Sequence, residues 1–295
     1  MGQCLYISSE KKICSKQSTK VALKLPRAIN GLEYNSYSRS FIPCSNIHIW
    51  LSELYKNSTW TNWIAYNDQN HDNIVKKGHC KGILTWNDTH VSWLCHSVPY
   101  FPREFTGKTI SEIDENEQIY GQSFHYYECV ITKDLIKNIF HQLYTMDACP
   151  IIEHYSGTQT WESELSMFNG RNIITKLVLE DTMVHIAKSP KGVIDIYSDC
   201  LTVYYPTSWK VESWIKGDEI KTPCSLITDI KNLSYINCNY KETQDHSKWA
   251  VSDQEWYWVG DLNRMTSQFT RGGGGFVGKD KNIANAFRSL IQTLK

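Results

Sequence analysis

Two tripeptides of the same pattern carry side chains suited to phosphoryl chemistry. They are His79-Cys80-Lys81 and His246-Ser247-Lys248, and each has another hydrogen-bonding side chain fifteen residues after its lysine: His96 and Asn263. One His-x-Lys in a chain of 295 residues means little. Two copies with the same follow-up spacing indicate a duplicated half-site.

Such a pair of half-sites is suited to cleaving a phosphodiester. Two ammonium groups and neutral donors can hold the non-bridging oxygens, where charge accumulates in the transition state. One imidazole can attack phosphorus and form a covalent intermediate, while the other protonates the leaving oxygen and later activates water. Because lysine and imidazolium supply the positive charge, we expect no metal and no other cofactor.

Local elements must bring these side chains together. Residues two apart on a β-strand project from one face, so His79 and Lys81 point together if residues 78–86 are extended. Residues 82–86 and 91–94 have the composition of strands, and polar residues 87–90 suit a turn. A hairpin centred between residues 88 and 89 places Lys81 opposite His96, on a shared face.

The second copy predicts the same layout. Residues 248–251 lead into a turn at residues 252–255, and residues 256–259 return toward Asn263. With the spacing of the first hairpin, Lys248 lies opposite Asn263. A bulge or a slip in register would spoil either pairing.

At these residues the chain resembles the deoxyribonuclease II family, whose fold belongs to the phospholipase D superfamily. The matching words are Gly78-His79-Cys80-Lys81-Gly82, His96-Ser97-Val98-Pro99, Tyr120-Gly121-Gln122-Ser123, Asp245-His246-Ser247-Lys248-Trp249, Gly260-Asp261-Leu262-Asn263-Arg264 and Arg271-Gly272-Gly273-Gly274. Weaker matches to the family are Leu23-Lys24-Leu25-Pro26, Tyr66-Asn67-Asp68-Gln69 and Ala187-Lys188. The words occur in family order from about residue 20 to the end, and residues 130–240 match only loosely.

The resemblance implies a mixed α/β fold, a phospholipase D-like pseudodimer of two sheet-plus-helix halves with the active site at their interface. We expect the halves to be residues 1–150 and 151–295, with Pro150 at the boundary. The implied activity is a metal-independent acid endonuclease on DNA that leaves 3′-phosphate ends. The family's catalytic set is unsubstituted at His79, Lys81, His96, His246, Lys248 and Asn263. In the superfamily the histidine of the first copy is commonly the nucleophile, which would make His79 the nucleophile and His246 the acid. Which histidine is phosphorylated stays open.

The match is not complete. Family members commonly carry cysteine where this chain has Ala250, Trp258 and Val277, and the last two resemble the partners of one disulfide, lost together. Intact site residues favour an enzyme. The altered cysteines and the loosely matching residues 130–240 leave an alternative open: a catalytically silent, secreted relative that binds DNA or a host protein. A phosphodiesterase acting on lipid or on other nucleic acids is a weaker candidate.

Three further motifs have two interpretations each. Arg271, Gly272 and Gly273 can contact a substrate phosphate through backbone N–H groups and a guanidinium, or form a flexible surface loop. A zinc site drawn from His79, Cys80, Cys95 and His96 is disfavoured, because a hairpin turns the cysteines away from the histidines. Tryptophans near both tripeptides can stack on bases, although packing in the core is the stronger expectation.

The charge balance is unusual for a protein that binds DNA. The chain has 31 basic and 31 acidic residues, whereas phosphate binding normally shows as a basic excess. Its 10 histidines offer a resolution, since protonation near pH ~5 would add up to about ten positive charges. We therefore expect DNA affinity to rise as the pH falls from about 7 to 5.

Other features concern compartment and local structure. Ten dispersed cysteines and sequons at Asn57, Asn87 and Asn232 favour an oxidising compartment, hence a lysosomal or secreted glycoprotein with disulfides. No run approaches the ~18–20 apolar residues that span a bilayer, and no signal peptide precedes the fold in the chain as given. Apolar spacing predicts helices over residues 134–144 and 280–294. Residues 106–122 read as an acidic surface excursion.

Overall fold

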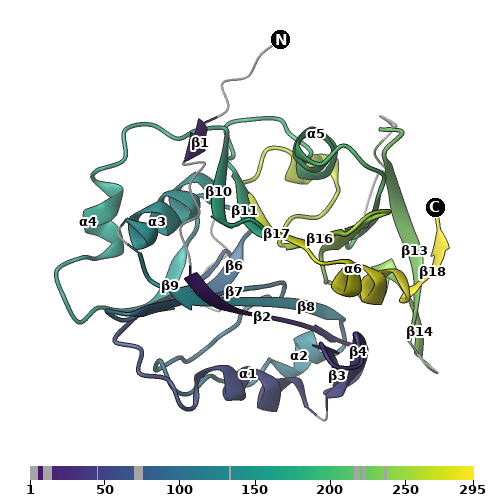
Figure 1. The fold of residues 1–295 in the computed structure, drawn as a ribbon, viewed down its shortest axis with the longest axis horizontal. Coiled ribbons are helices and arrows are strands. Elements are labelled where there is room, and N and C mark those ends of the chain that lie inside the picture. The colour runs from purple at the N-terminus through teal and green to yellow at the C-terminus, as the bar shows by residue number, and fades with distance from the viewer. Residues whose placement is uncertain are drawn as a thin grey trace.

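The computed structural model describes residues 6–8, 15–44, 46–69, 76–132, 134–215, 220, 224–235 and 238–295. Two large β-sheets stack face to face, with short helices on their outer sides and between their edges (Figure 1). This is a mixed α/β fold, as predicted. None of its described helices is long and apolar enough to cross a membrane.

The first sheet is built from the N-terminal part of the chain, and all its neighbouring strands are antiparallel. In spatial order its strands are β4 (Ser40–Cys44), β3 (Gly31–Asn35), β2 (Ser15–Lys24), β8 (Gln122–Val130), β7 (His90–His96), β6 (Lys81–Trp86), β5 (Asn62–Asn67) and β9 (Pro150–His154). Both faces of this sheet are covered, because neighbours such as Ile83 and Leu84 are fully buried in different apolar clusters.

The second sheet takes its strands mainly from the C-terminal part. In spatial order they are β1 (Tyr6–Ser8), β10 (Ile174–Glu180), β11 (Met183–Lys188), β17 (Gly273–Lys279), β16 (Trp256–Gly260), β15 (Trp249–Ser252), β12 (Trp209–Glu212), β13 (Ile227–Tyr235) and β14 (Cys238–Lys241), with β18 (Ile291–Leu294) on β13. The first sheet thus extends to His154, and β1 joins the second sheet. The predicted division at residue 150 stays a prediction.

Helices close the layers. They are α1 (Ile47–Tyr55), α2 (Glu115–Gln118), α3 (Leu135–Met146), α4 (Trp161–Leu165), a π-helical turn (Tyr197–Leu201) continued by α5 (Thr202–Tyr204), α6 (Lys281–Arg288), and 3-10 turns at Glu242–Gln244 and Thr266–Gln268. In Figure 1, α1 and α2 lie outside the first sheet and α5 outside the second. The main apolar core lies between the sheets, where β16 packs on β7 and β8.

Two helices cross from one sheet to the other. α3 follows β8 of the first sheet but packs on β10, β11 and β17 of the second. α6 follows β17 of the second sheet and packs on β4 of the first as well as on β15 and β16. The side chain of Asp280 caps α6 by accepting from two backbone N–H groups of its first turn. These crossings tie the two sheets into one body.

The helix predicted over residues 134–144 is confirmed as α3. The one predicted over residues 280–294 is right only at its start, since α6 ends at Arg288 and the last residues form β18. The reason is tertiary. The edge of β13 offers unpaired backbone groups, and an antiparallel ladder satisfies those of Ile291 and its neighbours.

Candidate active site

The first hairpin folds as the sequence predicts. β6 and β7 pair with Trp86 opposite Val91, and this register brings Lys81 and His96 to the same end of the hairpin. The side chain of Asn87 accepts two backbone N–H groups in the turn and fixes where the strand reverses.

A carboxylate that the sequence did not single out organises the first half-site. Asp68, which follows β5 and is 2 % exposed, lies with Oδ2 2.9 Å from His79 Nδ1 and with Oδ1 2.5 Å from Lys81 Nζ. The guanidinium of Arg271 donates to the same Oδ2 at 2.9 Å. One buried carboxylate therefore gathers three cationic or imidazole groups from two parts of the chain. In the sequence, the only indication of Asp68 was that it lies in the segment Tyr66-Asn67-Asp68-Gln69, which resembles the family weakly.

These contacts fix the protonation of His79. Burial alone raises the pKa of Asp68, but Lys81 and His79 outweigh it and hold that pKa well below its usual range. Burial, followed by the charge of Lys81, lowers the pKa of His79 to about 3. An ionised carboxylate can only accept hydrogen bonds, so Nδ1 of neutral His79 is the donor and Nε2 keeps its lone pair.

The second hairpin does not have the predicted register. The backbone N–H of Gly260 donates to the carbonyl of Lys248 at 3.0 Å, so Lys248 lies across from Gly260 and not from Asn263. The hydroxyl of Ser252 accepts two backbone N–H groups and closes a tighter turn than the first hairpin has. The equal spacing in the sequence therefore does not reflect equal pairing, and Asn263 belongs to the loop after β16.

His246 is held mainly by aromatic rings. Its ring stacks on Tyr120 with centroids 4.0 Å apart and planes at 11°, and the ring of Trp214 lies 4.5 Å away. Its Nδ1 is 3.5 Å from the carboxylate of Glu117. Burial lowers the pKa of His246, and Glu117 opposes that shift. Lys248 donates to the His246 carbonyl at 2.6 Å.

The acidic surface excursion predicted for residues 106–122 is wrong at Glu117, which is only 8 % exposed. The segment turns inward there because Asp114 caps the short helix α2, whose single turn carries Glu117 toward His246. Sequence reasoning therefore missed both carboxylates that contact the paired histidines.

Both half-sites open into one pocket of about 220 Å³, several times the ~30 Å³ that a water molecule occupies. The candidate residues that line it are His79, Lys81, His246, Lys248 and Asn263, and it is completed by Gln69, Ser97, Pro99, Trp214, Met265 and Gln268. The two half-sites are close enough for the charge of one to affect the pKa of groups in the other. Burial and then the charge of Lys81 lower the pKa of Lys248 to about 7.

His96 does not line this pocket; it is fully buried, with its ring 5.2 Å from that of Phe101. Its Nδ1 accepts the backbone N–H of Val98, so the neutral ring carries its proton on Nε2. Within the described part of the chain, Nε2 has no hydrogen-bond partner. Burial, followed by the charges of Lys81 and Lys248, lowers the pKa of His96 well below its usual value.

Most of the glycine-rich motif that follows Arg271 is part of a strand. Gly273 begins β17, which pairs with β11 and β16, so the interpretation as a flexible loop is wrong from there on. The carbonyl of Gly272 accepts the backbone N–H of His79 at 2.7 Å. A side chain at Gly272 would place its Cβ 1.9 Å from the Met146 carbonyl, so this close approach requires glycine. Neither Gly272, Gly273 nor Arg271 lines the 220 Å³ pocket, and their contact with substrate stays a prediction.

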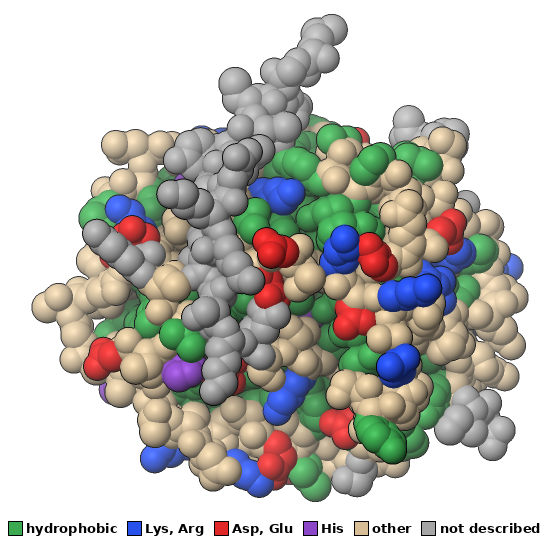
Figure 2. Space-filling model, viewed as in Figure 1, with side chains coloured by type: hydrophobic (Ala, Val, Ile, Leu, Met, Phe, Trp, Pro, Cys, Tyr) green, Lys and Arg blue, Asp and Glu red, His purple; other side chains and the backbone are tan. Residues whose placement is uncertain are grey.

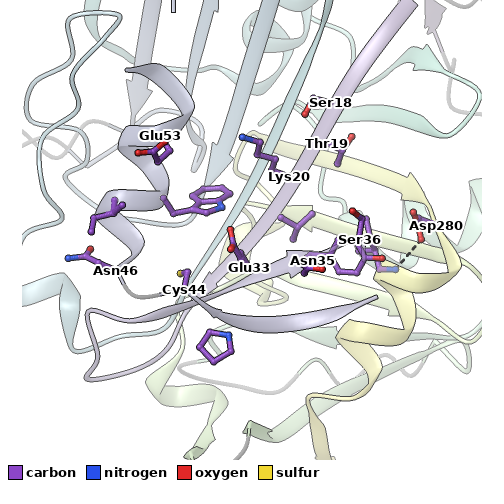
Figure 3. A pocket seen from close by; sticks show the side chains of 16 residues that line it. Ser18, Thr19, Lys20, Glu33, Asn35, Ser36, Cys44, Asn46, Glu53 and Asp280 are labelled. Atoms are coloured by element: carbon purple, nitrogen blue, oxygen red, sulfur yellow. Dashed lines mark hydrogen bonds between the residues drawn. The ribbon is translucent and has the colours of Figure 1, made fainter. Parts of the chain in front are cut away.

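A larger cavity of about 840 Å³ lies elsewhere, between β2, β3 and α1 (Figure 3). Its labelled charged residues are Lys20, Glu33, Glu53 and Asp280. Three carboxylates against one ammonium make it unsuited to a phosphodiester. The smaller pocket, with two lysines and two histidines, has the matching chemistry.

The charge expected from the histidines is reduced by burial. Of the described histidines, those with a lowered pKa are His79, His96, His125, His141, His185 and His246. Acidification to pH ~5 therefore adds fewer charges than the ten histidines of the sequence suggest. Acidic and basic side chains are intermingled on the face shown in Figure 2.

Four tryptophans of the two hairpins lie in the core. Trp86, Trp93, Trp249 and Trp258 are at most 5 % exposed, so they pack there as expected, and Trp256 is partly buried against the core. Trp258 and Val277, the positions that the family resemblance assigns to a lost disulfide, are direct partners across β16 and β17. The cysteines that the structure describes are free thiols. The described residues contain no cluster of three or more His, Cys, Asp or Glu arranged to hold a metal.

Comparison with known proteins places the chain in the family that the sequence motifs resemble. The family model for deoxyribonuclease II matches residues 35–295. Cell-death-related nuclease 7 of Caenorhabditis elegans is 29% identical over 269 residues, covering 82% of this chain and 71% of the relative. Deoxyribonuclease-2-beta of Mus musculus is 30% identical over 275 residues (81% and 73%), and Plancitoxin-1 of Acanthaster planci is 27% identical over 274 residues (82% and 73%). The chain belongs to the deoxyribonuclease II family.

Proposed function

We propose that this protein is an acid endonuclease that hydrolyses DNA through a phosphohistidine intermediate, without a metal, and leaves 3′-phosphate ends. One observation carries the proposal: a single pocket is lined by both His-x-Lys pairs. Several relatives are named deoxyribonucleases, which supports DNA as the substrate.

We also infer the phospholipase D-like pseudodimer. Each half contributes a hairpin that begins with a His-x-Lys pair, β6–β7 or β15–β16, and each hairpin is flanked by a strand that pairs with its first member, β5 or β12. Each half also sends the helix after its last central strand, α3 or α6, onto the other half. These correspondences support a duplicated fold with the site between the copies.

In the first step, Nε2 of His79 attacks phosphorus and the bond from phosphorus to the 5′ oxygen breaks. The leaving oxygen takes a proton from His246, which is then neutral. In the second step, His246 removes a proton from water, and the resulting hydroxide attacks phosphorus. The bond from phosphorus to His79 breaks, leaving a 3′-phosphate and the free histidine.

Donors around the pocket stabilise the charge that develops on the non-bridging oxygens. Lys248 and Lys81 supply ammonium groups, and Asn263 supplies an amide N–H. His96 does not line the pocket, but its unpartnered Nε2–H is buried close enough to both lysines to feel their charge, and we assign it as a further donor once substrate is bound. Asp68 holds His79 with the proton on Nδ1, so the nucleophilic nitrogen is free.

The histidine pKa values set the working pH. His79 must be neutral to attack, and burial lowers its pKa to about 3. His246 must be protonated to act as the acid, and burial lowers its pKa from the ordinary 6.5. Activity is therefore lost below pH ~3 and again as the pH rises through the lowered value of His246. This acid window supports a lysosomal or secreted enzyme.

Plasmid nicking at pH ~5 in EDTA tests the proposal. The wild type should nick, and His246→Ala should not. A silent DNA-binding relative would retain plasmid in a gel-shift assay and nick in neither form. Nicking that requires an added divalent metal would contradict the proposed mechanism.

A further inference from the structure

Two buried lysines outside the pocket gather backbone carbonyls at matching places in the two sheets. Lys24 ends β2 and is 1 % exposed. Its ammonium donates to the carbonyls of Gln118 at 2.6 Å, Tyr120 at 2.7 Å and Leu25 at 3.0 Å. Burial lowers the pKa of Lys24 to about 8. Two of the three hydrogen bonds therefore fix the main chain just before Gly121.

That segment forms the wall against which His246 lies. The carbonyl of Gly121 accepts the backbone N–H of His246 at 2.8 Å, and Gly121 bridges in parallel to Asp245. The ring of Tyr120 stacks on the His246 ring, and Glu117 faces its Nδ1. Lys24 of the first sheet thus fixes the end of a segment that contacts His246, which lies just before β15 of the second sheet, at three points.

Lys188 repeats the arrangement in the opposite direction. It ends β11 and is fully buried, and burial lowers its pKa to about 8. Its ammonium donates to the carbonyls of Phe269 at 2.9 Å, of Gln268 at 3.4 Å and, closely, of Arg271. This fixes the chain just before Gly272, whose carbonyl accepts the backbone N–H of His79. Arg271 also donates to Asp68, the partner of His79.

The register of the strands confirms that the two places match. Lys24 lies opposite Gln122, the residue after Gly121, and Lys188 lies opposite Gly273, the residue after Gly272. In each sheet, a lysine at a strand end holds the turn whose glycine carbonyl receives the catalytic histidine of the other sheet. If the lysines only satisfied buried carbonyls, they would not need to hold the segment that contacts the histidine of the opposite half, and the arrangement would not need to occur in both sheets.

We propose that Lys24 and Lys188 are crossed positioning residues, Lys24 setting His246 through residues 118–121 and Lys188 setting His79 through residues 268–272. The inference rests on the proposed function for the roles of the two histidines. Each lysine then controls the step performed by the histidine of the opposite half. A misplaced reacting group costs as much as ~10²-fold in rate, so the expected effects are large enough to measure.

The test compares Lys24→Met and Lys188→Met, which keep the length of the side chain and remove its donors. Matched controls are Lys20→Met on the same strand as Lys24 and Lys191→Met shortly after Lys188, both exposed in the wild type. Each lysine variant should lower kcat/KM for DNA at pH ~5 by ~10- to 100-fold. The controls should stay within about twofold of wild type.

A substrate with a good leaving group separates the two roles. Thymidine 3′-(4-nitrophenyl phosphate) needs little proton donation from His246, so Lys24→Met should recover kcat/KM to within about threefold of wild type. Lys188→Met should keep its deficit, because attack by His79 is still required. Equal deficits of both variants on both substrates would overturn crossed positioning in favour of a general structural role.

A second measurement needs no turnover. Titration of the histidine ring nitrogens by NMR should show an altered pKa for His246 in Lys24→Met and for His79 in Lys188→Met. If either variant fails to fold, Lys24→Gln or Lys188→Gln, which retain an N–H₂ donor, takes its place. A shift at the histidine of the same half would refute the proposal. An inactive wild type that shows the crossed shifts would refute the proposed function alone.

Discussion

The two half-sites contain the same pair of residue types but hold their histidines by different means. His79 is fixed by a buried carboxylate at 2.9 Å, and Lys81 and Arg271 share that carboxylate. His246 lies between the rings of Tyr120 and Trp214, and its carboxylate partner is 3.5 Å away. His79 is held by a hydrogen bond to a carboxylate, and His246 mainly by stacking.

The difference fits the two chemical roles that we propose for His79 and His246. A nucleophile must keep one tautomer, and an ionised Asp68 keeps the proton of His79 on Nδ1. An acid that later serves as a base must change its protonation state during turnover. Stacked rings hold an imidazole in place in either state, whereas a tight ion pair would favour the protonated one. The asymmetry therefore supports His79 as nucleophile and His246 as acid.

Removing each imidazole is expected to have the largest effect. His79→Ala and His246→Ala should both lower DNA cleavage by ~10⁴-fold or more. They should differ on thymidine 3′-(4-nitrophenyl phosphate). His246→Ala should release nitrophenol in one turnover and accumulate a phosphohistidine, seen by mass spectrometry, while His79→Ala should release none. Nitrophenol release by His79→Ala alone would reverse the assignment.

Removing the carboxylate under His79 comes next. Asp68→Asn should lower kcat by ~10²- to 10³-fold with little change in KM, because the nucleophile loses its fixed tautomer. Asp68 raises the pKa of His79, so its loss should move the acid limb of the pH–rate profile to lower pH. Asp253→Asn, at an exposed ion pair, is the control. A wild-type rate in Asp68→Asn would show that the carboxylate does not orient His79.

A smaller effect is expected at the second carboxylate. Glu117→Gln should lower cleavage at pH ~5 by about tenfold, because its contact with His246 is longer and weaker. Glu117 opposes the lowering of the His246 pKa, so the alkaline limb should move to lower pH. Glu115→Gln, exposed on the same helix α2, should leave the profile unchanged. An unmoved limb in Glu117→Gln would remove Glu117 from the site.

The smallest effect is expected at Trp214. Trp214→Leu should lower kcat/KM by ~3- to 10-fold, since Tyr120 still stacks on His246. Less burial should raise the pKa of His246, so the alkaline limb should move to higher pH, opposite to Glu117→Gln. The same measurement of rate against pH therefore separates the two contributions. Movement in the same direction would contradict the stacking argument.

The sequence predicted the parts of this site that depend on neighbouring residues. The first hairpin, with Trp86 opposite Val91, follows from apolar strands around a polar turn, and α3 follows from its apolar spacing. The reason is that turn residues such as Asn87 bond to their own backbone, whatever the rest of the chain does. The candidate residues of both tripeptides were likewise proposed from their types and spacing, and both pairs line one pocket.

What the sequence missed depends on distant partners. Asp68 had no local signal, because His79 and Lys81 meet it only after β5 and β6 pair. Glu117 read as a surface residue until α2 turned it toward His246. The register of the second hairpin was wrong because Ser252 closes its turn more tightly than a matched spacing implies. The C-terminal strand replaced a predicted helix because β13 had a free edge.

The sequence by itself determined the chemical inventory: two imidazole–ammonium pairs, two further polar side chains and a core large enough to hold them. Tertiary structure alone decided which carboxylate each histidine contacts, and that Asn263 reaches the pocket without pairing with Lys248. The physical reason is that burial and charge act through space. The pKa of His79 falls because the fold excludes water and brings Lys81 close, and no local pattern of residues encodes either.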